Sequence, residues 1–98
     1  MLKKQALQKG KVIKVKFETQ PLPDASTVFL VGDFNDWSET SHPMKQRKTD
    51  KCFAIDVKLE PGREYQFRYL VDGEWHNDWS ADQYVQNEFG GDNSVVIT

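Results

Sequence analysis

Hydrophobic and polar residues alternate along several short stretches of this chain. Between Lys11 and Thr19 every second position is apolar, and the same period recurs at residues 53–58 and 65–71. A period of two places apolar side chains on one face of a strand and polar side chains on the other. No stretch shows a sustained 3.6-residue apolar period with caps at its ends. The pattern therefore predicts strands and no helix.

Turn-forming residues separate these stretches. The breaks fall at Pro21 and Pro23, at Gly32 after an apolar run from Thr27, at Pro61-Gly62, at Asp72-Gly73 and at Gly90-Gly91 before a last strand at residues 94–98. An Asp-Gly pair between β-type residues is the strongest short-range signal for a two-residue type I′ hairpin. Six to eight short strands in 98 residues predict one all-β domain, an immunoglobulin-like antiparallel β-sandwich with about 7–8 strands.

Charge is distributed unevenly along the chain. Six lysines crowd the start, whereas every charged residue after Arg68 is acidic. We interpret the basic start as a flexible N-terminal segment, residues 1–10, followed by the solvated face of the first strand. The sandwich domain is then expected to span residues 11–98.

Composition narrows the class of protein. The chain is 38% hydrophobic and 12% aromatic, with a net charge of -2, which is typical of a globular domain. Its apolar runs are far shorter than the roughly 20 residues that cross a bilayer, and no signal-peptide core follows the first lysines. Cys52 is the only cysteine, so no intrachain disulfide can form. We expect a cytoplasmic protein with no membrane partner.

The predicted hairpin places an aromatic residue outside the core. In a two-residue hairpin Leu70 lies opposite Trp75, and Arg68 lies opposite Asn77. If the 65–71 strand turns its aromatic residues inward, these four side chains share the outer face. An exposed indole beside a guanidinium and an amide suits a sugar ring, because the indole covers its C–H face. The pairing alone leaves open that Trp75 only caps an open end of the sandwich.

Two loops offer similar combinations. Trp37 ends a turn rich in Gly, Asn and Asp, in which Phe34 could fill the core while Trp37 projects. The loop near the C-terminus combines Phe89 with amide side chains on a backbone that contains two glycines.

Three motifs in order resemble a known family. They are VFLVGDFNDWS at residues 28–38, FRYLVDGEW at 67–75 and FGGDNSVV at 89–96. Together they resemble carbohydrate-binding module family 48, whose early-set domains include the glycogen-binding domain of the AMP-activated protein kinase β subunit and the N-terminal domains of isoamylases and glycogen-branching enzymes. Three motifs at the right spacing are more specific than any one of them.

The resemblance implies a set of binding residues. Trp37 and Trp75 stand at the positions of the two stacking tryptophans, Arg68 at that of a sugar-contacting base, and Asn93 at that of a hydroxyl-binding amide. Phe89 takes the place of an apolar residue that packs on the glucan. Gly91 falls where the kinase subunit has Thr, and both are departures from that subunit. Trp79 is either a third platform or a packing residue, and we favour packing.

The sequence thus predicts a non-catalytic module that binds α-glucans, namely glycogen, starch or malto-oligosaccharides, without cofactor or metal. The alternative is a docking module of the same fold that packs against a glucan-metabolising enzyme or regulatory protein and binds no sugar. Titration with β-cyclodextrin would separate the two.

Other classes find little support. His42 and His76 have no ligand-spaced partners, and Asp33/Asp36 and Asp78/Asp82 are more typical of turns than of an acid/base pair. Nucleic acid is disfavoured as a partner, because the aromatic residues lie in the acidic half of the chain.

Overall fold

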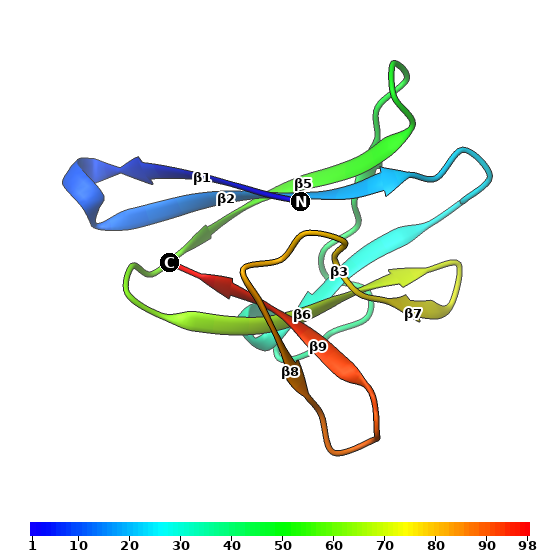
Figure 1. Cartoon of the computed structure of the whole chain (residues 1–98). Coiled ribbons are helices and arrows are strands. Elements are labelled where there is room, and N and C mark those ends of the chain that lie inside the picture. Colours follow the sequence, from blue (N-terminus) through cyan, green and yellow to red (C-terminus); the bar gives the residue numbers. More distant parts are fainter.

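The computed structural model describes residues 1–98, which form two antiparallel sheets packed face to face (Figure 1). The strands are β1 Leu2–Leu7, β2 Val12–Pro21, β3 Val28–Gly32, β4 Lys45–Gln46, β5 Cys52–Leu59, β6 Glu64–Val71, β7 Glu74–His76, β8 Gln83–Gln86 and β9 Asp92–Ile97. Two short 3₁₀ turns, η1 Gln8–Gly10 and η2 Asp33–Asn35, complete the chain. The prediction of an all-β sandwich is confirmed. No helix is long and apolar enough to cross a membrane.

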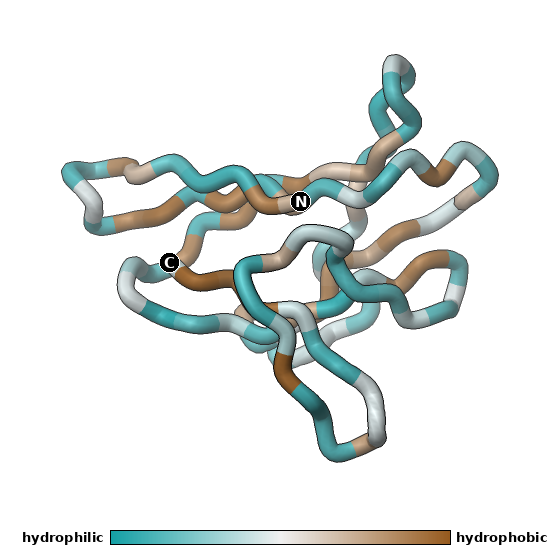
Figure 2. The backbone as a smooth tube through the Cα atoms, in the orientation of Figure 1, coloured by the Kyte–Doolittle hydropathy of each residue, from teal (hydrophilic) through white to brown (hydrophobic).

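The first sheet has the strand order β1-β2-β5-β4, and the second has the order β3-β6-β9-β8. Strand β7 also pairs with β6, on the edge that β9 occupies further along. In Figure 1 β1, β2 and β5 form the upper layer and β3, β6, β8 and β9 the lower one. Figure 2 shows the hydrophobic stretches within strands of both layers, whereas the connecting loops are mostly hydrophilic.

The core lies between the two sheets. Val15 and Phe17 of β2 are fully buried, as are Leu30 of β3 and Phe67 of β6. The Phe17 and Phe67 rings meet edge to face at 4.9 Å, a favoured arrangement for aromatic pairs. In β2 and β6 these residues alternate with polar or charged ones, so the period of two in the sequence predicted the inner face of these two strands correctly.

The hairpin between β6 and β7 has the predicted register. Val71 lies opposite Glu74, Leu70 opposite Trp75 and Tyr69 opposite His76. The two turn residues, Asp72 and Gly73, both have positive φ, as a type I′ turn requires. The Asp72 carboxylate also accepts hydrogen bonds from the backbone of Ser26 and Thr27, and these bonds lower its pKa.

The beginning of the chain differs from the expectation. We expected residues 1–10 to form a flexible segment outside the domain, but Leu2–Leu7 is an edge strand that pairs with β2 along its whole length. Leu2 packs against the core, which gives the strand an apolar anchor. Strands β4 and β8 were not predicted either; β4 has two residues and β8 four.

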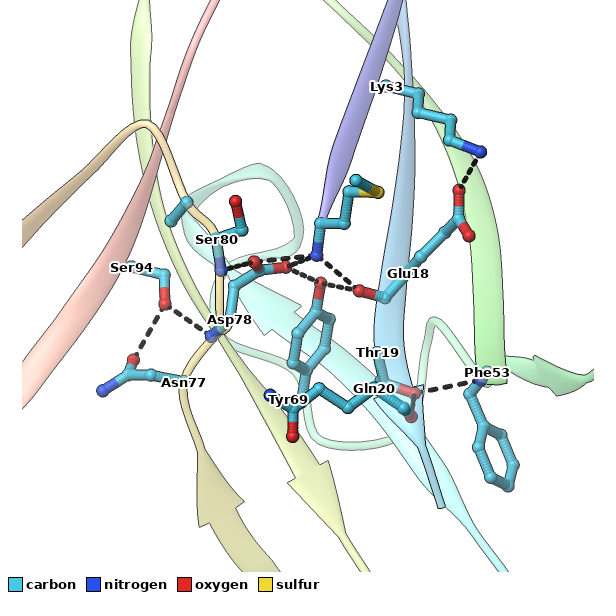
Figure 3. A network of polar contacts seen from close by, with 12 residues as sticks. Lys3, Glu18, Thr19, Gln20, Phe53, Tyr69, Asn77, Asp78, Ser80 and Ser94 are labelled. Carbon is cyan, nitrogen blue, oxygen red and sulfur yellow. Dashed lines mark hydrogen bonds and ion pairs between the residues drawn. The ribbon is translucent and has the colours of Figure 1, made fainter. Parts of the chain in front are cut away.

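Buried polar groups connect the two sheets at one end of the sandwich (Figure 3). The Asp78 side chain is fully buried and accepts hydrogen bonds from the Tyr69 hydroxyl at 2.5 Å and from the Ser80 backbone at 2.7 Å. The amino group of Met1 lies 2.7 and 2.8 Å from its two oxygens. Burial and the neighbouring Asp78 raise the pKa of Tyr69 well above its ordinary value. The hydroxyl therefore stays protonated and remains a donor to Asp78.

Glu18 is a second buried carboxylate, on β2 and only 4% exposed. Its oxygens lie 3.0 Å from the Lys3 ammonium and 2.6 Å from the Arg47 guanidinium. Burial raises the pKa of Glu18, but the hydrogen bonds from Lys3 and Arg47 outweigh burial and hold it below its ordinary value of 4.5. The ionised form of Glu18 therefore stabilises the folded state.

We predict that Glu18→Gln lowers the free energy of unfolding at pH 7 by about 1 kcal/mol. A carboxyl whose pKa is lowered by folding contributes its stability above its unfolded pKa of about 4.5 and loses it as the pH falls through the folded pKa. The difference between Glu18→Gln and wild type in urea unfolding should therefore shrink from pH 7 to pH 3. Glu39, exposed and without a hydrogen bond or ion pair, supplies the control Glu39→Gln. An equal difference at both pH values would contradict the assignment.

Candidate functional site

A groove of about 540 Å³ lies on the second sheet, on the face turned away from the core. Its lining comes from four separate parts of the chain: the loop after β3, the middle of β6, strand β7, and the β8–β9 hairpin. The lining residues are Asp33, Trp37, Gln66, Arg68, Trp75, Asn87, Glu88, Phe89 and Asn93.

The loop after β3 depends on a close approach of β3 to β6. A Cβ atom at Gly32 would lie 2.6 Å from the Gln66 carbonyl oxygen and 2.8 Å from the Phe67 Cβ, so no larger residue fits without displacing β6. After this glycine the chain enters η2, where Phe34 turns inward and packs on Phe17, with 5.5 Å between the two ring centres. This confirms the prediction that Phe34 fills the core while Trp37 projects.

The Asn35 side chain closes this loop. Its Oδ1 accepts a hydrogen bond from the Gly32 backbone at 3.1 Å, and its Nδ2 donates to the Leu30 carbonyl at 3.0 Å. The same Nδ2 lies 3.0 Å from the His42 Nδ1. Because the backbone of β3 fixes which end of the amide is the donor, the His42 Nδ1 must be the unprotonated, accepting nitrogen.

Trp37 projects from this loop with its side chain 36% exposed. Its backbone has φ of 58°, a left-handed conformation that is uncommon for a bulky residue. Two hydrogen bonds hold it there: the Trp37 backbone donates to the Gly32 carbonyl at 2.9 Å, and the indole Nε1 donates to the Asp33 Oδ1 at 2.9 Å. The other oxygen of Asp33 accepts from the Gln66 backbone N–H at 2.7 Å. Asp33 thus connects the indole of Trp37 directly to β6.

Arg68 and Trp75 come from the β6–β7 hairpin. The Arg68 guanidinium lies 5.8 Å from the centre of the Trp75 ring, within the range of a cation–π contact. Trp75 is 42% exposed, while Leu70, opposite it in the register, is buried. The Arg68 side chain makes no hydrogen bond or ion pair within the chain, and its Nε is buried without a partner. Apart from this buried Nε, the donors of the guanidinium are therefore free to bind a ligand in the groove.

The β8–β9 loop forms the opposite end of the groove. The Asn87 Oδ1 accepts backbone hydrogen bonds from Phe89 at 2.9 Å and Gly91 at 3.1 Å, which folds the loop around this side chain. Gly90 adopts φ of 85°, the left-handed region that glycine enters without strain. Phe89 is held at the tip with 89% of its surface exposed. An aromatic ring this exposed has no packing role in the folded chain.

The floor of the groove is a row of amides. The Asn87 Nδ2 donates to the Asn93 Oδ1 at 3.1 Å, and the Asn93 Nδ2 donates to the Gln66 Oε1 at 2.9 Å. Asn93 is only 8% exposed. The floor is therefore rigid and polar, and the aromatic side chains stand around it.

The charges of the groove are few. Its lining has two carboxylates, Asp33 and Glu88, and one cation, Arg68. Both oxygens of Asp33 accept hydrogen bonds from N–H donors, so this carboxylate stabilises the loop. No serine, threonine, cysteine or histidine lines the groove, and nowhere in the chain do three or more His, Cys, Asp or Glu residues gather as they would around a metal ion. The arrangement offers aromatic faces and hydrogen-bond donors.

All five residues that the sequence singled out line this one groove: Trp37, Arg68, Trp75, Phe89 and Asn93. Both indoles are exposed, and they share the groove although 38 positions of sequence separate them. Asn77 does not join them, because β7 ends at His76 and the Asn77 side chain bonds instead to Ser94 and to the Asp92 carbonyl.

Trp79 lies elsewhere. It is 51% exposed and borders a small pocket of about 60 Å³, together with residues that include Gln20, Leu22 and His76. With half of its surface exposed, Trp79 does not fill the core, so the packing that we favoured is at most partial.

Three lining residues with structural roles were not among the site residues predicted from the sequence, namely Asp33, Gln66 and Asn87. The spacing of Asp33 and Trp37, four residues apart in the turn that follows Gly32, was a usable signal for a carboxylate that holds the indole. Gln66 gave no signal of its own, because its role depends on a loop that meets it only in the folded chain. Asn87 did give a local signal, since an asparagine shortly before two glycines is typical of a side chain that bonds to the backbone of its own loop.

The sequence matches one family model. Residues 13–98 match the family described as the glycogen recognition site of AMP-activated protein kinase. The match covers all but the first 12 residues, so it includes every residue of the groove.

Three relatives give the range of similarity. The chain is 41% identical over 74 residues to the rice Protein FLOURY ENDOSPERM 6, chloroplastic, covering 76% of this chain and 13% of the rice protein. It is 32% identical over 69 residues to the pig 5'-AMP-activated protein kinase subunit beta-1, covering 70% of this chain and 52% of the subunit. It is 39% identical over 46 residues to the 1,4-alpha-glucan branching enzyme of Deinococcus radiodurans, covering 47% of this chain and 6% of the enzyme. The chain thus spans about half or less of each relative.

We predict that Asp33→Asn weakens the attachment of Trp37. An amide has one acceptor oxygen where the carboxylate has two, so either the Trp37 indole N–H or the Gln66 backbone N–H loses its partner, at a cost of about 0.5–1.5 kcal/mol. NMR hydrogen exchange should show that at least one of these two protons exchanges faster than in wild type.

The matched control is Asp36→Asn in the same loop, since the Asp36 side chain makes no hydrogen bond and asparagine also tolerates its left-handed φ of 55°. Both protons should exchange there at the wild-type rate. Unchanged protection of both protons in Asp33→Asn would show that Asp33 does not hold Trp37.

Proposed function

This chain belongs to the family of glycogen recognition sites of AMP-activated protein kinase, and from that premise we propose that it is a non-catalytic module that binds α-glucans in the groove. The ligands that we infer are glycogen, starch and malto-oligosaccharides. The observation that carries the proposal is that Trp37 and Trp75, from two distant motifs, line one groove with both indoles exposed.

The chemistry of the groove supports a neutral sugar. Indole faces cover the C–H faces of pyranose rings, and the free donors of Arg68 suit hydroxyl oxygens. Phe89, at the tip of the β8–β9 loop, adds a third apolar surface at one end. Asn93 has one amide hydrogen left after its bond to Gln66. Aromatic faces around a polar floor are typical of sites that recognise a ring with one apolar face and a hydroxyl rim.

The expected affinity is modest. If each indole loses about 100 Å² of apolar surface to a sugar ring, the gross gain is about 5 kcal/mol. The entropy cost of association cancels much of this gain, and the hydrogen bonds of Arg68 and Asn93 add to what remains. We expect dissociation constants between about ten micromolar and one millimolar for short oligosaccharides, with tighter binding of longer ones.

The groove is a poor candidate for catalysis. Glycoside hydrolysis needs two carboxyl groups that face each other across the sugar. Of the two carboxylates here, Asp33 is engaged by the Trp37 indole and the β6 backbone, and Glu88 is exposed on the β8–β9 loop. This supports a binding role without chemistry.

The wider setting of the module rests on its relatives. One is named a protein kinase subunit and another a 1,4-alpha-glucan branching enzyme, and this chain spans only part of each. We therefore propose that the module brings a catalytic or regulatory partner to the glucan. The cytoplasmic location stays a prediction, because the rice relative is named chloroplastic.

We predict that maltoheptaose binds with a saturable change in intrinsic fluorescence and in calorimetric titration. Trp37→Ala and Trp75→Ala should each weaken binding at least about tenfold, because each removes one stacking face worth about 2 kcal/mol. The control is Trp79→Ala, which removes an even more exposed indole that lies outside the groove.

Three results would count against the proposal. Equal loss of binding in Trp79→Ala would move the site away from the groove. Cello-oligosaccharides that bind as tightly as malto-oligosaccharides would remove the preference for α-glucans. If none of these sugars binds, the alternative is favoured, in which the same tryptophans contact a protein partner.

A further inference from the structure

We propose that Gln66 is a further ligand-contacting residue, which presents its side-chain NH₂ group to the groove that the two tryptophans also line. The inference rests on the proposed function, because it assigns a donor to the same site. Gln66 is on β6, two residues before Arg68, so the two side chains leave the strand on the same face. Both line the groove.

The side-chain amide of Asn87 has only one possible orientation. Its Oδ1 accepts hydrogen bonds from two backbone N–H groups, those of Phe89 and Gly91, and a backbone N–H can only donate. The oxygen of Asn87 therefore faces its own loop, and its Nδ2 faces the Asn93 side chain at 3.1 Å.

This orientation passes along the floor to Gln66. Because the Asn87 Nδ2 is a donor, the Asn93 atom that meets it must be the oxygen, which leaves the Asn93 Nδ2 to face Gln66. That nitrogen donates to the Gln66 Oε1 at 2.9 Å. The Gln66 oxygen is thus occupied from the side of Asn93, and the Gln66 Nε2 is the end that remains.

The Nε2 of Gln66 has no hydrogen-bond partner within the chain, and Gln66 is half-buried among the lining residues. Its backbone is fixed as well, since its N–H donates to the Asp33 carboxylate that also holds Trp37. Gln66 and Arg68, which has no hydrogen-bond partner within the chain, therefore both present N–H donors to the groove beside its aromatic side chains. Such donors favour ligands with oxygen atoms that accept hydrogen bonds, such as the hydroxyls of a glucose unit.

Two substitutions at Gln66 distinguish direct contact with the sugar from structural support of Asn93. Gln66→Glu keeps an oxygen that accepts from Asn93 but replaces the groove-facing NH₂ by an oxygen, so it removes the donor and adds a negative charge. Gln66→Met has a similar length and removes both. If Gln66 contacts the sugar, Gln66→Glu should weaken maltoheptaose binding about five- to tenfold at pH 7, and Gln66→Met by at least as much.

Gln86→Glu is the matched control. Gln86 is exposed on β8, next to Asn87, and it does not line the groove. Its replacement by Glu therefore adds the same charge near the groove without removing a donor from it. Its affinity should equal that of wild type. The Asn93 side-chain amide protons should exchange with solvent as slowly in Gln66→Glu as in wild type, which would show that the hydrogen bond from Asn93 is kept.

The outcomes are distinct. Wild-type affinity in Gln66→Glu, with a loss only in Gln66→Met, would overturn the inference, because Gln66 would then act only by accepting from Asn93. An equal loss in Gln86→Glu would overturn it too, since charge alone would explain the effect. Failure of the wild-type chain to bind maltoheptaose would remove the proposed function and this inference with it.

Discussion

The alternation of side chains along β6 is the constraint on which the core and the groove both depend. Phe67 and Tyr69 point into the core, whereas Gln66 and Arg68 point to the opposite face. The same strand pairs with β3, β7 and β9. The loop after β3, strand β7 and the β8–β9 hairpin supply the rest of the groove. A shift of β6 by one residue would exchange the two sets of side chains and destroy both.

The Trp37 loop shows how the core supports the site. Gly32 lets β3 lie against β6, Phe34 fills the core, and Trp37 is left in a left-handed backbone conformation. Such a conformation costs about 1–3 kcal/mol and persists only where its surroundings enforce it. Here the Asp33 carboxylate and the Gly32 carbonyl supply that enforcement. The indole is therefore in place before any ligand arrives, which lowers the entropy cost of binding.

Much of this arrangement could be predicted from sequence. Alternating residues and turn signals identified the long strands, and Asp72-Gly73 fixed the register that turns Trp75 outward. Strand β1 was not predicted, because its lysines and glutamine show no clear alternation of apolar and polar residues. Only its pairing with β2 identifies it as a strand. The chain of amides through Asn87, Asn93 and Gln66 joins residues from β6 and the β8–β9 hairpin. Local patterns contain no information about contacts of that kind.

The central claim is that two indoles bind one glucan together while the third takes no part. The three indole Nε1–H resonances, observed by NMR during titration with maltoheptaose, test this claim directly. The account predicts that the Trp37 and Trp75 signals shift together along one binding curve and that the Trp79 signal stays in place. A curve in which Trp79 shifts, or in which only one of the groove tryptophans responds, would contradict it.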